Sequence, residues 1–132
     1  MNKKLERFHV YFYGPAKGPL ETSFEEAQAR LEEEPRLHFE PDGSFVWSLD
    51  AKEQLYGMLY DAQGRLQYAE LQGNCTAVVW QRLVRLIIGK HRDGKPLESE
   101  HQVMMLPERI LKDLHAFEQT TWNEGQTDEL SG

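Results

Sequence analysis

Histidine, tyrosine and glutamate side chains recur at alternate positions in three segments of this sequence, and these residue types can bind ligands and move protons. Histidine titrates near neutral pH, and a carboxylate beside it can tune it for acid–base work. Tyrosine offers a broad apolar ring with a hydroxyl that forms hydrogen bonds. The candidate binding residues are His9, Tyr11, Tyr13, His38, Glu40, Tyr56, Tyr60, Tyr68 and Glu70.

These candidates can share one surface because alternate residues of a strand point to the same face of a sheet. Residues 7–13 (RFHVYFY) alternate in this way and are rich in aromatic and β-branched types, which favours a strand. Residues 36–49 and 54–71 repeat the alternation on both sides of a turn. We therefore expect one face that carries tyrosines, histidines and carboxylates. The same composition is also typical of a half-exposed sheet face that has no catalytic role.

Two glycine-containing turns set the expected pairing of the strands. The Asp-Gly pair at residues 42–43 is a strong signal for the first hairpin and predicts that Leu37 lies opposite Trp47. In the second hairpin, Asp61–Gly64 predicts a bulged turn, and counting back from it places Tyr60 opposite Leu66 and Gly57 opposite Ala69. Two small residues at the centre of a sheet would let another element approach closely.

Three helices are expected around the strands. Ser23 precedes Glu26 by three residues, which is the spacing of a capping box, so a helix begins here and ends before Pro35. The most apolar helix begins near residue 76 and ends at Gly89. Pro107 would occupy the first turn of a third helix. The apolar stripe of that helix would be Ile110, Leu111, Leu114, Phe117 and Trp122.

The order of these elements predicts the α+β class, because the strands follow one another instead of alternating with helices. We expect an antiparallel meander sheet of about five strands, with an N-terminal helix and two C-terminal helices packed mainly on one face. Residues 1–122 would form a single domain, and residues 123–132 a flexible C-terminal tail. The most apolar helix would cover the leucine-rich face, which leaves the tyrosine-rich face to contact something else.

The chain has 132 residues, a formal net charge of −7 and a pI of about 5.2. This balance argues against nucleic-acid binding, which rests on lysine and arginine neutralising phosphates, and against an anionic membrane surface. The one cysteine, Cys75, excludes an intramolecular disulfide. The N-terminal residues lack the apolar core of a signal peptide, so we expect a cytoplasmic protein. No cofactor motif is present, and we expect no cofactor.

Two further polar clusters occur in the second half of the chain. The basic cluster consists of Arg82, Arg85, Lys90 and Arg92. It could dock an acidic partner or a phosphate, or it could simply complement the negative end of a helix dipole. Metal-binding side chains gather at His91, Asp93, Glu98, Glu100 and His101. Their spacing matches no zinc pattern, so we expect no metal site.

These observations favour a small binding or adaptor domain that acts through protein–protein contacts on its aromatic sheet face. Its partner would be another protein or a second copy of the chain, since tyrosine is enriched at interfaces. The alternative is a small-molecule-binding protein or a small enzyme that uses a cleft of histidine, tyrosine and glutamate on the same face. Whether the chain is an enzyme stays open at this point.

Overall fold

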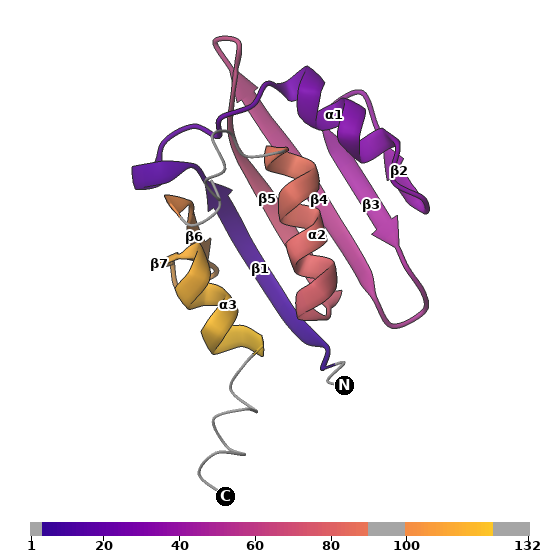
Figure 1. Cartoon of the computed structure of the whole chain (residues 1–132), viewed down its shortest axis with the longest axis vertical. Helices are drawn as coiled ribbons and strands as arrows, with labels where there is room; N and C mark the ends of the chain where they lie inside the picture. Colours follow the sequence, from indigo (N-terminus) through magenta and orange to yellow (C-terminus); the bar gives the residue numbers. More distant parts are fainter. Residues whose placement is uncertain (1–3, 90–99, 123–132) are drawn as a thin grey trace, which may run out of the picture.

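The computed structural model describes residues 4–89 and 100–122 of the chain. These residues form an α+β fold with a seven-stranded antiparallel sheet and three α-helices (Figure 1). The elements are β1 (Glu6–Tyr13), the 3-10 turn η1 (Pro15–Lys17), α1 (Phe24–Glu32), β2 (Leu37–Phe39), β3 (Ser44–Ser48), β4 (Gln54–Ala62), β5 (Arg65–Cys75), α2 (Ala77–Ile88), β6 (Gln102–Met105), β7 (Ile110–Asp113) and α3 (Leu114–Trp122). The strand order is β2-β3-β4-β5-β1-β6-β7, so β1 lies between a four-strand meander and a C-terminal hairpin.

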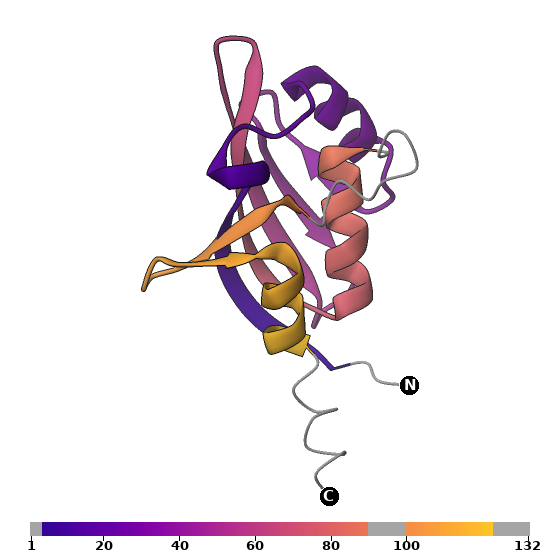
Figure 2. The ribbon, with the colours of Figure 1, turned by 60° about the vertical axis from the view of Figure 1, so that its left-hand side comes forward.

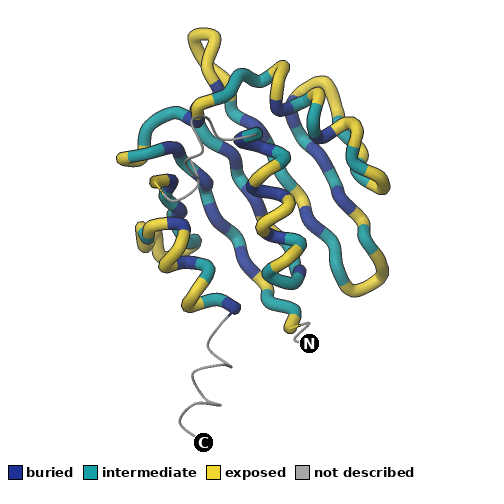
Figure 3. The backbone as a smooth tube through the Cα atoms, viewed as in Figure 1, coloured by how far each residue is buried: buried dark blue, intermediate teal, exposed yellow. Residues whose placement is uncertain are grey.

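The hydrophobic core lies between the sheet and the helices, which occupy one side of it (Figures 1 and 2). Trp80 of α2 packs against Phe8 of β1 at 5.1 Å between ring centroids, and against Phe117 of α3 at 5.2 Å. Trp122 of α3 lies 5.9 Å from the Phe8 ring. Along β1 the buried and less buried residues alternate, as the tube in Figure 3 shows. Burial of this aromatic cluster therefore holds both C-terminal helices on the same face of the sheet.

Helix α1 begins as its sequence predicts. The Ser23 hydroxyl accepts a hydrogen bond from the Glu26 N–H, and the Glu26 carboxylate accepts one from the Ser23 N–H, which completes the capping box. The helix covers the β2 edge of the sheet and also contacts α2 (Figure 1). There Arg30 donates to the Leu86 and Ile87 carbonyls at 2.7 Å each. These carbonyls belong to the last turn of α2, where backbone acceptors lack helical partners.

The prediction of about five strands was wrong, because β6 and β7 form a further hairpin at the edge of the sheet. Residues 102–105 pair with β1, and residues 110–113 pair with β6. The hairpin bends away from the helices, as Figure 2 shows. Neither four-residue strand has a clear sequence signal of its own. Pairing of β6 with the aromatic strand β1, and of β7 with β6, decides their conformation instead.

The start of the third helix was also predicted wrongly. Pro107 lies in the turn between β6 and β7, and α3 begins only at Leu114. Ile110 and Leu111 therefore belong to β7, where they are exposed instead of facing the core. The remaining members of the predicted stripe, Leu114, Phe117 and Trp122, are buried as expected. The predicted tail, residues 123–132, lies outside the described residues.

The first hairpin has the predicted register, whereas the second does not. Gln63 and Gly64 both have positive φ angles, of 57° and 76°, so they form a two-residue turn that pairs Ala62 with Arg65. An irregularity next to Tyr60 then shifts the pairing, and Tyr60 lies opposite Tyr68. The predicted partner of Tyr60, Leu66, is fully buried.

The same shift changes the neighbours of Gly57. This glycine lies opposite Leu71 and Phe45, and not opposite Ala69 as predicted. A Cβ atom at position 57 would lie 2.1 Å from the Phe45 ring. The glycine therefore makes room for a neighbouring aromatic side chain on the core face, and not for the backbone of a second element.

Cys75 is buried at the end of β5, and burial raises the pKa of its thiol from 9.0 to about 12, with the Glu53 carboxylate adding to the rise. At pH 8, iodoacetamide should therefore alkylate the native protein about a thousandfold more slowly than the urea-unfolded chain, as followed by mass spectrometry. The folded state holds this proton more tightly, so stability should fall as pH rises from about 9 toward 12. Equal alkylation rates in native and unfolded protein would show that the thiol is accessible.

Candidate functional site

The face of the sheet opposite the helices presents a group of tyrosines from three adjacent strands. We call it the open tyrosine face and define it by Tyr11 and Tyr13 of β1, Tyr56 and Tyr60 of β4, and Tyr68 and Glu70 of β5, together with His9 of β1. The register brings them together, since Tyr68 lies opposite Tyr60 on one side and opposite Tyr13 on the other. Alternation along β1, β4 and β5 thus places these side chains on one face, although the pairing predicted for β4 and β5 was wrong.

Tyr68 is the centre of the aromatic cluster. Its ring stacks on Tyr60 at 4.6 Å with an interplanar angle of 20°. Tyr11 and Tyr13 lie 5.3 Å and 5.4 Å from the same ring. Burial among the rings raises the pKa of Tyr13, Tyr60 and Tyr68, so their hydroxyls stay protonated at neutral pH and can donate hydrogen bonds.

A hydrogen-bonded chain connects this cluster to His9. The Tyr60 hydroxyl donates to the Glu70 carboxylate at 3.1 Å, and the other oxygen of Glu70 lies 2.7 Å from Nε2 of His9. The side chains of His9 and Glu70 are 39% and 29% exposed, so both groups can meet a partner molecule. The arrangement fixes the orientation of the imidazole and presents a polar strip beside the rings.

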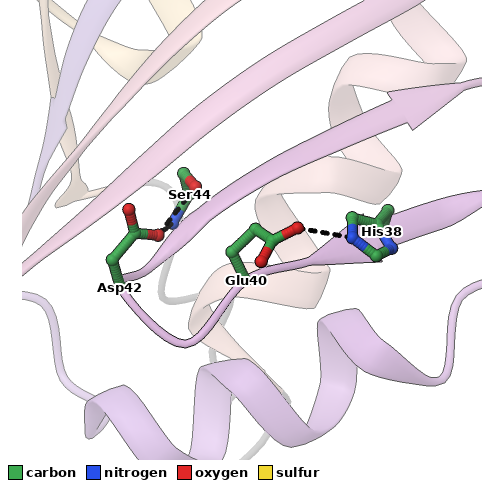
Figure 4. Close-up of polar contacts among 4 residues, drawn as sticks. All are labelled: His38, Glu40, Asp42 and Ser44. Atoms are coloured by element: carbon green, nitrogen blue, oxygen red, sulfur yellow. Dashed lines mark hydrogen bonds and ion pairs between the residues drawn. The ribbon is translucent and has the colours of Figure 1, made fainter.

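The other predicted histidine lies apart from this group. His38 belongs to β2, and strands β3, β4 and β5 separate it from His9, a separation of about 19 Å at the usual strand spacing. Its Nε2 lies 2.6 Å from the carboxylate of Glu40, and both side chains are exposed (Figure 4). The structure therefore forms two separate histidine–glutamate pairs on the sheet instead of one cleft that uses both histidines.

A shallow depression of about 900 Å³ adjoins the open tyrosine face, at the end of the sheet where β1 and β4 begin. The register places Arg7, Asn74 and Gln54 side by side there. The described residues that line it include Arg7, His9, Lys52, Gln54, Tyr56, Gln72 and Asn74. Most of these polar residues were missing from the sequence-based site. Continuing the alternation of β4 by one step would have found Gln54, and continuing that of β5 by two steps would have found Gln72 and Asn74. Lys52 lies in a loop and gives no such signal.

The predicted basic cluster is only partly described. Arg82 donates two hydrogen bonds to the Glu34 carboxylate, at 2.7 Å and 3.0 Å, and these bonds raise the pKa of its guanidinium. Arg85 is exposed on α2, and Lys90 and Arg92 lie outside the described residues. Arg82 thus helps to join α2 to the end of α1. A docking role for the cluster stays a prediction.

Of the metal-binding side chains named in the sequence analysis, only Glu100 and His101 belong to the described residues. His91, Asp93 and Glu98 lie outside the described residues. His101 is buried, with its ring stacked on Phe12 at 5.4 Å. Within residues 4–89 and 100–122, no three metal-binding side chains come together.

Comparison of the chain with protein-family models, with curated proteins and with solved structures found no match. Of the helices in the described ranges, none has the length and apolar character needed to cross a membrane. The open tyrosine face and its adjoining depression are therefore the features from which a function can be inferred.

Proposed function

We propose that this chain is a protein-binding domain and that its contact surface is the open tyrosine face. The observation that carries the proposal is the one-sided packing of the helices, which leaves a contiguous tyrosine cluster in contact with solvent. Contiguous apolar patches on a protein surface commonly mark sites of interaction with other molecules. The domain would act in the cytoplasm, the compartment that its single reduced cysteine favours.

The residues around the tyrosines support the same function. Tyr56 is 44% exposed, and Leu111 of β7 is 42% exposed. Leu111 pairs with Met104, which pairs with Tyr11, so an apolar row extends from the cluster to the edge of the sheet. Tyrosine and methionine are enriched in protein interfaces, where rings bury area and hydroxyls keep a polar contact.

The alternative function is the binding of a small polar molecule. It is favoured by the depression of about 900 Å³, which has the size of a ligand site, and by the fixed His9–Glu70 pair at its edge. A ligand bound there should raise the melting temperature of the wild type, and His9→Ala should abolish the rise. A protein interface predicts no such dependence on a small molecule.

A comparative capture experiment tests the proposed function. Wild-type protein, Tyr56→Glu, Tyr68→Glu and the control Val78→Glu are immobilised and exposed to the same cell extract. Val78 is 74% exposed on α2, so its variant adds the same charge on the helical side of the molecule. We expect wild type and Val78→Glu to retain one protein that both tyrosine variants lose, and its purified form to bind with the same preference. Equal retention by all four forms would contradict the proposal.

A further inference from the structure

The depression of about 900 Å³ beside the open tyrosine face gathers cations in an acidic protein. Its described lining residues include Arg7, His9 and Lys52, and none of them carries a carboxylate. The chain as a whole has 22 acidic residues against 15 lysines and arginines. A concave site whose lining carries one sign of charge attracts ligands of the opposite sign, so the depression favours an anion.

Arg7 is the cation in this depression that has no partner. Its side chain is exposed, and within the described ranges it forms no hydrogen bond or ion pair. Alternation turns its neighbour Glu6 to the other face of the sheet, where Glu6 pairs with Lys4 at 3.2 Å. A guanidinium is always charged, and its fork of N–H donors matches two oxygens of a phosphate group.

A fixed loop brings Lys52 to the same depression. The Asp50 carboxylate accepts the backbone N–H groups of Lys52 and Glu53 at 2.7 Å and 2.8 Å. The Asn74 amide, which lies opposite Arg7 in the register, donates to the Lys52 carbonyl at 2.7 Å and so connects the loop to the sheet. Asp50 also attracts the Lys52 ammonium, so Lys52 should contribute less to the binding of an anion than Arg7 does.

Two neutral side chains complete the depression. The Tyr56 hydroxyl donates to Oε1 of Gln54 at 3.1 Å, whereas the NH₂ group of Gln54 has no partner among the described residues. Gln54 therefore has a donor to offer to an anion. The Tyr56 ring is 44% exposed and lines the same depression, where it presents a flat apolar surface.

The carboxylate of Glu70 lies close to this depression but is already occupied. One of its oxygens lies 2.7 Å from Nε2 of His9, and the other accepts the Tyr60 hydroxyl at 3.1 Å. The pairing of His9 with Glu70 leaves little net charge at that edge. The attraction for an anion therefore has to come from Arg7 and Lys52.

We infer that the depression binds a small molecule that carries a phosphate group and a planar ring. The phosphate would lie against the cations of Arg7 and Lys52 and accept a hydrogen bond from Gln54, and the ring would stack on Tyr56. A phosphate monoester carries about two negative charges at neutral pH, so it matches two cations better than a carboxylate does. This inference goes beyond the proposed function and stands whether or not the open tyrosine face has a protein partner.

A small molecule fits the depression better than a macromolecule. Its volume lies within the range of small-molecule sites. Binding of a nucleic acid rests on many lysines and arginines along its backbone, and the described lining has two. An acidic protein that extended beyond the depression would be repelled by the net charge of −7.

Titration of the full-length protein with phenyl phosphate, at constant ionic strength and followed by ¹H–¹⁵N NMR, tests the inference. Inorganic phosphate and phenol each carry one of its two groups, so each should bind about tenfold more weakly. Benzoate keeps the ring but replaces the phosphate with a carboxylate, and it should bind about fivefold more weakly. The largest shifts should come from the amides of Arg7, Gln54 and Asn74.

Four variants of exposed residues assign the two parts of the site. Arg7→Gln should weaken the binding of phenyl phosphate by about tenfold. Tyr56→Leu should reduce it to the affinity of inorganic phosphate, whereas Tyr56→Phe keeps the ring and should bind within about threefold of wild type. Arg65→Gln removes an arginine outside the depression and should match wild type. Each variant should keep a native circular dichroism spectrum, because its side chain is exposed.

Several results would overturn the inference. One is the absence of binding at about ten millimolar phenyl phosphate, and another is binding that Arg7→Gln leaves unchanged. Benzoate that bound as tightly as phenyl phosphate would exclude phosphate as the recognised group, and equal binding of inorganic phosphate would exclude the ring. A hexaglutamate peptide that bound more tightly would make an acidic protein the occupant. None of these results decides whether the open tyrosine face contacts a protein, which capture and solution mass test separately.

Discussion

Replacing Gly57 with valine should lower the free energy of unfolding by about 3 kcal/mol, although valine is a better strand former than glycine. The physical cause is space. A Cβ atom at this position would lie 2.1 Å from the Phe45 ring, which is only 2% exposed and stacks on Phe39 at 6.2 Å. The ring has no free volume into which it can move, because cores are packed as densely as crystals. Urea unfolding followed by circular dichroism measures the change.

A double variant distinguishes this steric explanation from a general intolerance of strand β4 to substitution. Phe45→Ala alone should cost about 3 to 4 kcal/mol through its cavity. Adding Gly57→Val to Phe45→Ala should cost little more, because the alanine vacates the space that the valine needs. If the losses in free energy of unfolding from the two substitutions were additive, the Phe45 ring would not be the obstacle. A Gly57→Val protein as stable as wild type would contradict the contact itself.

Replacing Trp80 with alanine should lower the free energy of unfolding by about 3 to 5 kcal/mol, enough to unfold much of a marginally stable domain. Trp80 is fully buried and contacts Phe8 of β1 as well as Phe117 and Trp122 of α3. Its Nε1 also donates to Glu118 at 3.0 Å. One side chain thus joins the sheet, α2 and α3. Removing it leaves a cavity where all three meet.

Two further variants make this prediction specific. Trp80→Phe keeps most of the aromatic contact and loses the hydrogen bond, so it should cost about 1 to 2 kcal/mol. Val78→Ala lies on the same helix at an exposed position and should change stability by less than about 0.5 kcal/mol. If Trp80→Ala were no more destabilising than Val78→Ala, α2 would not be the centre of the core.

Local chemistry explains which parts of the fold could be predicted from the sequence. The Asp42-Gly43 turn fixes a single pairing of β2 with β3, and Leu37 lies opposite Trp47 as predicted. The capping box at Ser23 and the glycine after α2 mark helix ends through backbone hydrogen bonds, which nearby residues satisfy. By contrast, the turn at Gly64 is compatible with more than one loop length. The register of β4 against β5 therefore depends on packing that the local sequence does not show.

The candidate site was predictable to the extent that it depends on strand alternation. Tyr11, Tyr13, Tyr60 and Tyr68 share a face because β1, β4 and β5 are neighbours. The sequence does not contain that neighbour relation, since residues of β1 pair with residues of β5 that come 55 to 69 positions later. The same strand order places His38 on β2, at an edge of the sheet and four strand spacings from β1. The polar lining of the depression beside the open tyrosine face was missed for the same reason, since Lys52 lies in a loop whose position follows from the strand order.

Solution mass by light scattering, over a hundredfold range of concentration, tests most directly that the open tyrosine face is a protein-binding surface that accepts a second copy. We expect the wild-type mass to rise from 15.4 kDa toward twice that value as concentration increases. Tyr68→Glu should stay at the monomer mass while keeping a native circular dichroism spectrum, and Val78→Glu should follow the wild type. If all three proteins gave the same curve of mass against concentration, the open tyrosine face would not mediate self-association, and that result would contradict the account.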